Sequence, residues 1–114
     1  MHEFSLMEEV LRAVRDSAQE ENIRRIHSVQ MTVGSMGCAF PPALETAFSV
    51  LTEGDPLFEE AALEIEERPV RVRCATCGWE AVGGDARFLC EECGSSRIDI
   101  LAGEELTIDG YEGE

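Results

Sequence analysis

Apolar side chains recur at helical spacing near the start of the chain, and charged residues occupy the positions between them. The recurring positions are Met7, Val10, Leu11, Val14 and Ala18. Just before them, Ser5 and Glu8 have the spacing of a capping box, in which two side chains satisfy free backbone amides of the first turn. The pattern therefore predicts a helix from about residue 5 to about residue 21, with its apolar stripe packed in a core.

A strict alternation of apolar and polar positions follows between His27 and Val33, and it predicts a half-buried strand that ends at the loop 34–37. His27 lies on the apolar face of this pattern and is expected to be a structural side chain. Pro41 and Pro42 suit the first turn of a second helix, because a missing amide costs little there. The stripe that this helix is predicted to bury is Leu44, Ala47, Phe48 and Leu51.

The segment 53–67 contains seven acids and no base. Within it, Leu63 and Ile65 alternate with glutamates, which predicts a second strand with a solvent-exposed acidic face. Two later pairs of alternating apolar residues predict a hairpin that turns near Gly103 and Glu104. The last five residues of the chain are expected to fray.

Four of the five cysteines form two Cys-x2-Cys pairs with twelve residues between them, and a glycine follows each pair. The pairs are Cys74 with Cys77 and Cys90 with Cys93. Two residues between cysteines allow one tight turn to aim both sulfurs at a single ion, so the pattern predicts a tetrahedral zinc site with four thiolates. Because few apolar residues lie between the pairs, bound metal is expected to supply much of the folding energy of this segment.

Two other chemistries use the same sulfurs. A rubredoxin-like iron site has the same Cys-x2-Cys-Gly turns, and a redox-active dithiol needs only one pair. A closed shell of four thiolates leaves no open position for catalysis, and no nucleophile is paired with a base, so the protein is not expected to be an enzyme. The fifth cysteine, Cys38, is expected to be a small, partly buried side chain.

The order of these elements predicts an α+β fold, with a small mixed sheet, two helices and a zinc-ribbon insert of four cysteines. A length of 114 residues fits one domain with a small insert. The α+β domain is expected to span residues 1–72 and 98–114, and the zinc-binding insert residues 73–97.

The charge of the chain narrows the class of partner. Twenty-four acids face nine arginines and no lysine, for a formal charge of −15. Binding to nucleic acid depends on neutralising phosphates, so a DNA- or RNA-binding role is disfavoured, and an anionic membrane surface is disfavoured for the same reason. No apolar run approaches the roughly 18 residues of a membrane span, and no basic segment precedes an apolar one as in a secretory signal. We expect a soluble cytoplasmic protein that is a monomer or a weak homodimer.

The first three residues, Met1-His2-Glu3, offer a second metal-binding chemistry. The α-amine of Met1, the amide between residues 1 and 2, and the imidazole of His2 can reach one ion through fused chelate rings. Such a nitrogen-rich, near-planar geometry suits Ni(II) or Cu(II) better than Zn(II) or Mg(II). Glu3 can support the site by a hydrogen bond or by coordination.

These features together resemble the HypA/HybF family of nickel metallochaperones for hydrogenase maturation. The resemblance covers essentially the whole chain, and its anchors are Met1-His2-Glu3, the segment from Val29 to Gly37, the helix from Ala43 to Leu51, and the four cysteines. Ser35 and the apolar pair Ala39-Phe40 depart from the usual family pattern, but they do not affect the two metal sites.

The resemblance implies a nickel-binding α+β domain with His2 as nickel ligand, the Met1 amine near it and Glu3 in support. Cys74, Cys77, Cys90 and Cys93 would be the zinc ligands. It also implies delivery of Ni(II) to the large subunit of [NiFe]-hydrogenase together with a nickel-binding GTPase, with urease as a further recipient in some members. From the residues alone, the alternatives are a zinc-ribbon adaptor that binds other proteins and a rubredoxin-like electron carrier.

Overall fold

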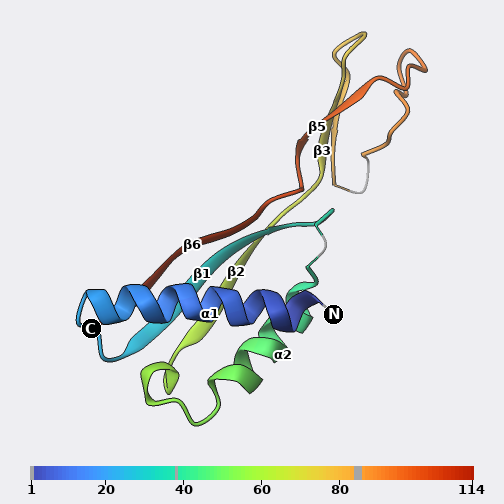
Figure 1. Cartoon of the computed structure of the whole chain (residues 1–114). Coiled ribbons are helices and arrows are strands. Elements are labelled where there is room, and N and C mark those ends of the chain that lie inside the picture. The colour runs from blue at the N-terminus through green and yellow to red at the C-terminus, as the bar shows by residue number, and fades with distance from the viewer. Residues whose placement is uncertain (1, 38, 84–85) are drawn as a thin grey trace. The chain divides into compact units, whose positions relative to one another are not determined.

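The computed structural model describes residues 2–37, 39–83 and 86–114, and of His2 it describes the backbone alone (Figure 1). Its elements are α1 (His2–Glu20), β1 (Ile26–Gly34), α2 (Pro41–Thr52), the short 3-10 helix η1 (Pro56–Phe58), β2 (Ala62–Arg68), β3 (Arg71–Cys74), β4 (Glu80–Val82), β5 (Ile98–Ala102) and β6 (Leu106–Gly113). The α+β prediction is confirmed. No helix of the described residues is both long and apolar enough to cross a membrane.

The chain divides into two compact units. The first unit is made of residues 1–32, 38–66 and 107–114, and the second unit is made of residues 33–37 and 67–106. The insert expected over residues 73–97 lies within the second unit, which extends beyond it on both sides and also takes the segment after β1.

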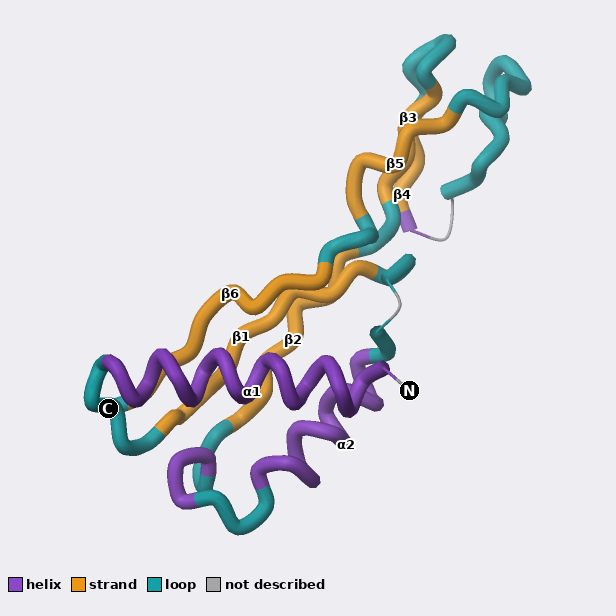
Figure 2. Tube along the Cα trace, viewed as in Figure 1, coloured by secondary structure: helices purple, strands orange, loops and turns teal. Residues whose placement is uncertain are grey.

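In the first unit, α1 and α2 pack against each other, and the sheet has the strand order β2-β1-β6 (Figure 2). Its fully buried side chains come from all of these layers: Met7 and Val10 on α1, Ile26 and Val29 on β1, and Leu44 on α2. The predicted apolar stripe of α1 is therefore confirmed as the core. The predicted stripe of α2 is confirmed at Leu44, Ala47 and Phe48, which are buried, whereas the fourth position, Leu51, is half-buried.

In the second unit, β3 is the central strand of the order β4-β3-β5, with both neighbours antiparallel. The backbone of the segment 33–37 is bonded into this unit: the amide of Ser35 donates to the carbonyl of Arg68 at 2.9 Å and the amide of Met36 donates to that of Gly103 at 2.8 Å. Gly34 and Gly103 approach so closely that a Cβ atom on Gly34 would lie 2.1 Å from the Gly103 oxygen. Only glycine fits at this position, because backbone atoms fill the space.

Two predictions about the C-terminal strands are wrong. The hairpin expected to turn near Gly103 does not form, because β5 pairs with β3 in one sheet and β6 lies beside β1 in the other. The tail does not fray: the amide of Glu114 donates to the carbonyl of Arg25 at 2.8 Å, and the amides of Arg24 and Arg25 donate to the carbonyl of Glu114. β6 is the edge strand beside β1, and this pairing satisfies its backbone groups along a nine-residue strand. In a hairpin, β6 would have paired with the five-residue strand β5.

The N-terminal boundary of α1 and the burial of β1 also differ from expectation. The helix begins at His2, so Ser5 lies inside the helix and the predicted capping box does not form. The alternation in β1 is interrupted, since both Ser28 and Val29 are buried while His27 is exposed. His27 donates a hydrogen bond from Nε2 to the carboxylate of Glu114 at 2.8 Å instead of packing in the core. As the middle strand of its sheet, β1 has a neighbouring strand along each edge, and its polar residues Ser28 and Thr32 are buried while Gln30 is half-buried.

Candidate metal centre

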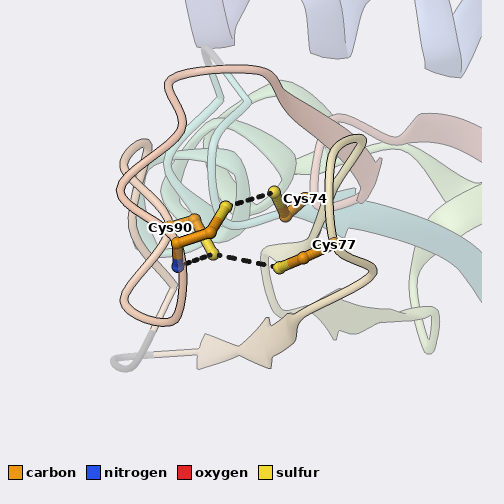
Figure 3. A group of neighbouring side chains, drawn as sticks. Cys74, Cys77 and Cys90 are labelled. Carbon is orange, nitrogen blue, oxygen red and sulfur yellow. Dashed lines mark hydrogen bonds between the residues drawn. The ribbon is translucent and has the colours of Figure 1, made fainter.

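The four paired cysteines converge in the second unit. Their sulfur atoms all lie within 4.8 Å of one another, and the residues alternate between buried and exposed along the chain. The sulfurs of Cys74 and Cys93 are 3.7 Å apart, and those of Cys77 and Cys90 are 3.5 Å apart. Figure 3 shows the sulfurs turned toward one another from two separate loops. Zinc–sulfur bonds of about 2.3 Å in a tetrahedron place sulfurs about 3.8 Å apart, so this cluster fits a zinc ion.

Two backbone turns of the same form position these sulfurs. In the first turn, Gly78 donates its amide to the carbonyl of Cys74 at 2.9 Å. In the second turn, Gly94 does the same to Cys90 at 3.0 Å. Both glycines have a positive φ, +86° and +74°, and a Cβ atom on either would meet nothing within 4 Å. Glycine is therefore favoured here by the backbone conformation alone and not by lack of space.

Backbone amides around the sulfurs support the thiolate form. The amides of Glu92 and Cys93 both donate to the sulfur of Cys90 at 3.3 Å. The amide of Cys77 is the main cause that lowers the pKa of Cys74 to about 6. Amides that donate to cysteine sulfurs in this way stabilise thiolates, which are the form of cysteine that binds a metal ion.

Four thiolates cannot share this space without a cation. The amide of Trp79 acts to lower the pKa of Cys77, but the neighbouring sulfur of Cys90 and the loss of solvation outweigh it and raise that pKa to about 12. The pKa of Cys93 is raised as well: the amide of Ser95 lowers it, and desolvation and the Cys90 sulfur outweigh that effect. A divalent ion removes this repulsion by replacing the protons, and zinc would hold the two turns together without supplying an open catalytic position.

The second unit has little else to hold it. Among its described residues, the buried side chains are Val33, Val72, Cys74 and Cys90. The apolar residues between the cysteine pairs do not form a core, since Phe88 is 56% exposed. A metal bound by the four cysteines would therefore add tertiary contacts around the turns that the few buried side chains do not supply.

The N-terminal candidate site is described only in part. Met1, the side chain of His2, and Cys38 lie outside the described residues. Glu3 is half-buried, and its carboxylate accepts a hydrogen bond at 3.1 Å from the backbone amide of Phe40. Phe40 is the N-cap residue of α2 and has no side-chain cap of its own, so Glu3 caps α2 from the first turn of α1. The sequence carries no local signal for this contact, because 37 positions separate the two residues.

The fold and the cysteine cluster define a class: a small α+β protein with a closed four-thiolate metal site. A family model described as "Hydrogenase/urease nickel incorporation, metallochaperone, hypA" matches residues 1–113. The chain therefore belongs to the HypA family of nickel metallochaperones for hydrogenase maturation.

Two relatives and one solved structure agree with this assignment. The chain is 46% identical to a hydrogenase maturation factor HypA of Moorella thermoacetica, over 100% of both chains. It is 32% identical to the protein of the same description from Aquifex aeolicus, over 100% of this chain and 98% of the relative. The fold is also similar to the solution structure of the Ni metallochaperone HypA from Helicobacter pylori, with a TM-score of 0.65, 23% identity, and coverage of 99% of this chain and 97% of the other.

Proposed function

We propose that this chain binds Ni(II) through Met1, His2 and Glu3 and delivers it to the large subunit of [NiFe]-hydrogenase, with urease as a second recipient. The observation that carries the proposal is the family match over residues 1–113, which includes the nitrogen-rich start of the chain. Nickel is the cargo in this proposal, whereas zinc in the four-cysteine site is a resident structural ion.

The backbone at the start of α1 supports this chelate. The helix begins at His2, and the first four amides of a helix have no acceptor within the helix. The amides that a nickel chelate needs are therefore not committed to the helix. The carboxylate of Glu3 lies in the first turn, where its negative charge offsets the positive end of the helix dipole, which would otherwise oppose a cation.

The nitrogen ligands also supply a means of release. Each must lose a proton to bind metal, the imidazole with a reference pKa near ~6.5 and the α-amine near ~7.8. Nickel affinity is therefore expected to rise from mildly acidic pH toward pH 8, and protonation of the imidazole or the α-amine would release the ion. The thiols of the four-cysteine site also lose protons on binding metal, but four thiolates enclose the ion, so that site is expected to hold its zinc more tightly than the N-terminus holds nickel.

The parts of the chain would divide the work. The α+β domain over residues 1–72 and 98–114 would carry nickel, and the insert over residues 73–97 would carry zinc. The partners would be a nickel-binding GTPase and the hydrogenase large subunit, and the net charge of −15 disfavours nucleic acid as a partner. We place delivery in the cytoplasm, where free thiols persist as this cysteine cluster requires.

Nickel titration of four forms of the chain tests the proposal. His2→Ala removes the imidazole, and residues added before Met1 convert the amine to an amide, so both forms should lose nickel affinity while retaining zinc. His27→Ala is the matched control, because His27 is the other histidine, is exposed, and lies at the far end of β1 from the loop that leads to α2. This control should bind nickel as the wild type does.

Equal nickel affinity in all four forms would contradict the proposal and indicate that nickel binds elsewhere on the chain.

Metal analysis of the purified chain tests the alternative of a rubredoxin-like electron carrier. A red, iron-containing protein would indicate a rubredoxin-like electron carrier, whereas a colourless protein with about one zinc per chain is expected.

A further inference from the structure

A cleft in the first unit includes none of the residues assigned to metal. It has a volume of 710 Å³ and is lined by α2, by η1 and by the start of β2. Its apolar wall is formed by exposed or half-buried lining residues, Pro56, Ala61, Ala62 and Leu63. Beneath this wall the rings of Phe48 and Phe58 meet edge to face with centroids 6.2 Å apart, and both side chains are buried. The two aromatic rings therefore belong to the core beneath the cleft, and the residues above them line the cleft itself.

The lining of this cleft is acidic. Glu45, Glu53, Asp55 and Glu59 all line it, and no basic residue does. Asp55 is paired with an arginine, but the three glutamates form no ion pair with any residue that the structure describes. Three uncompensated carboxylates beside an apolar wall favour a ligand that is both cationic and partly apolar.

A guanidinium of the chain itself shows which cation this surface accepts. Arg15 reaches the edge of the cleft from α1 and donates to the carboxylate of Asp55 at 2.6 Å. Its guanidinium carbon lies 5.3 Å from the centroid of the Phe58 ring. A flat guanidinium can donate to the carboxylate and lie over the ring at the same time, whereas a lysine ammonium is a compact, strongly hydrated point charge that matches this combination less well.

Arg15 leaves most of the cleft open. It is not among the lining residues, and its side chain remains 46% exposed. The second oxygen of Asp55 accepts the amide of Leu57 at 3.0 Å, so both oxygens of Asp55 already accept a hydrogen bond, whereas the three glutamates form no ion pair with any described residue. An incoming arginine would therefore pair with the glutamates, and its aliphatic stem would cover the apolar wall.

We propose that this cleft docks an arginine-bearing segment of a partner protein. The arginine pairs with Glu45, Glu53 and Glu59, next to the place where Arg15 already pairs with Asp55. The inference is independent of the nickel proposal, because it uses neither the N-terminal residues nor the four cysteines. It also gives the strongly acidic segment 53–67 a task that the metal sites do not explain.

An NMR titration of the full chain, purified with its metal, tests the proposal. The probe is the peptide acetyl-Gly-Arg-Gly-Arg-Gly-amide, compared with the same peptide containing lysine. The arginine peptide should shift the amides of α2, η1 and β2, and it should bind more tightly than the lysine peptide. In the variant E45Q/E53Q/E59Q its affinity should fall about tenfold, since each exposed pair contributes about 0.5 kcal/mol.

The control variant E8Q/E9Q/E20Q removes the same charge from exposed positions of α1. It should change the affinity by no more than about twofold, because distant exposed charges are screened. Equal weakening in both variants would show diffuse attraction to an acidic protein and would overturn the proposal. Equal affinity for the two peptides would overturn recognition of arginine.

Two further results would replace the partner segment with another occupant. Displacement of the peptide by Mg²⁺ alone would make the cleft a cation site. Concentration-dependent shifts of the same amides without peptide, lost in E45Q/E53Q/E59Q, would make it a contact between copies of this chain. Far-UV circular dichroism and zinc content should be unchanged in both variants, because all six substituted glutamates are exposed.

Discussion

The two units of this chain are held together by different means. The first unit has a layered apolar core to which α1, α2 and β1 all contribute fully buried side chains, such as Met7, Leu44 and Val29. The second unit buries only four apolar or sulfur-bearing side chains among its described residues, and two of these are cysteines of the cluster. One region folds by removing apolar surface from water, and the other has a cluster of four thiols that a metal could neutralise and join. The comparison predicts that each unit responds to a different perturbation.

The largest expected effect is that of removing one thiolate. Cys74→Ser should release the zinc and unfold the second unit, because structural zinc supplies about 10–16 kcal/mol of apparent binding energy in small zinc domains. Amide signals of residues 67–106 should collapse in an NMR spectrum while those of α1 and α2 persist. Thr76→Ala is the control, since Thr76 lies in the same turn, its hydroxyl bonds to that of Ser95, and the substitution keeps its backbone amide. Loss of the α1 signals in Cys74→Ser would show that the two units fold as one.

The reverse perturbation removes part of the apolar core. Leu44→Ala should lower the free energy of unfolding of the first unit by about 2–5 kcal/mol, because it leaves a cavity at a position with 0% exposure. Zinc content should not change. Val50→Ala on the same helix is the control and should cost little, because Val50 is 52% exposed. Denaturant unfolding with zinc analysis measures both; zinc loss in Leu44→Ala would contradict the separation of the units.

A smaller effect is expected from the backbone of the zinc turns. Gly94 has a φ of +74° with open space around it, so Gly94→Ala introduces strain but no collision. The left-handed conformation costs about 1–2 kcal/mol for a residue with a Cβ atom, which corresponds to a zinc affinity roughly 5–30 times lower. Gly94→Asn should lose less, because asparagine tolerates this conformation better. Competition with a chelator measures the series, and equal affinities would contradict the argument from φ.

The smallest expected effect concerns the exposed ion pair of the first unit. The hydrogen bond from Arg15 lowers the pKa of Asp55 below its ordinary value of 3.8. The pair therefore stabilises the folded state at neutral pH, and this contribution is lost as the pH falls through the lowered pKa. Arg15→Met should cost about 0.5 kcal/mol at pH 7, and the difference from the wild type should be smaller near pH 2, where protonation of Asp55 weakens the pair. Unfolding curves at both pH values measure this, and a difference that grows in acid would contradict it.

The sequence was sufficient where the structure is local. Helical spacing from Met7 to Ala18, the two prolines before α2 and the two Cys-x2-Cys pairs each constrain only residues that are close along the chain. The predicted zinc ligands therefore come together in the structure. The same local pattern placed β5 and β6 in a hairpin, because alternation shows that a strand forms but not which strand it pairs with.

The contacts that could not be predicted join distant residues. Glu3 and Phe40 are brought together by the packing of the two helices, and His27 and Glu114 by the pairing of β6 with β1. Ser5 has the residue type of an N-cap, but the helix begins at His2 because α1 is stabilised over its length by packing rather than by its cap. The nickel ligands stay a prediction from the sequence and the resemblance.

The close approach of Gly34 and Gly103 limits how this protein can evolve. A Cβ atom on Gly34 would collide with the backbone oxygen of Gly103, and one on Gly103 would lie 2.7 Å from the Cα atom of Val70. Collisions with side chains can be relieved by a second substitution that makes the neighbouring side chain smaller. These collisions are with main-chain atoms, which every residue has, so no second substitution can make room for a Cβ atom at either position. A library that randomises both codons and is selected for folding should therefore return glycine at each, independently of the residue chosen at the other.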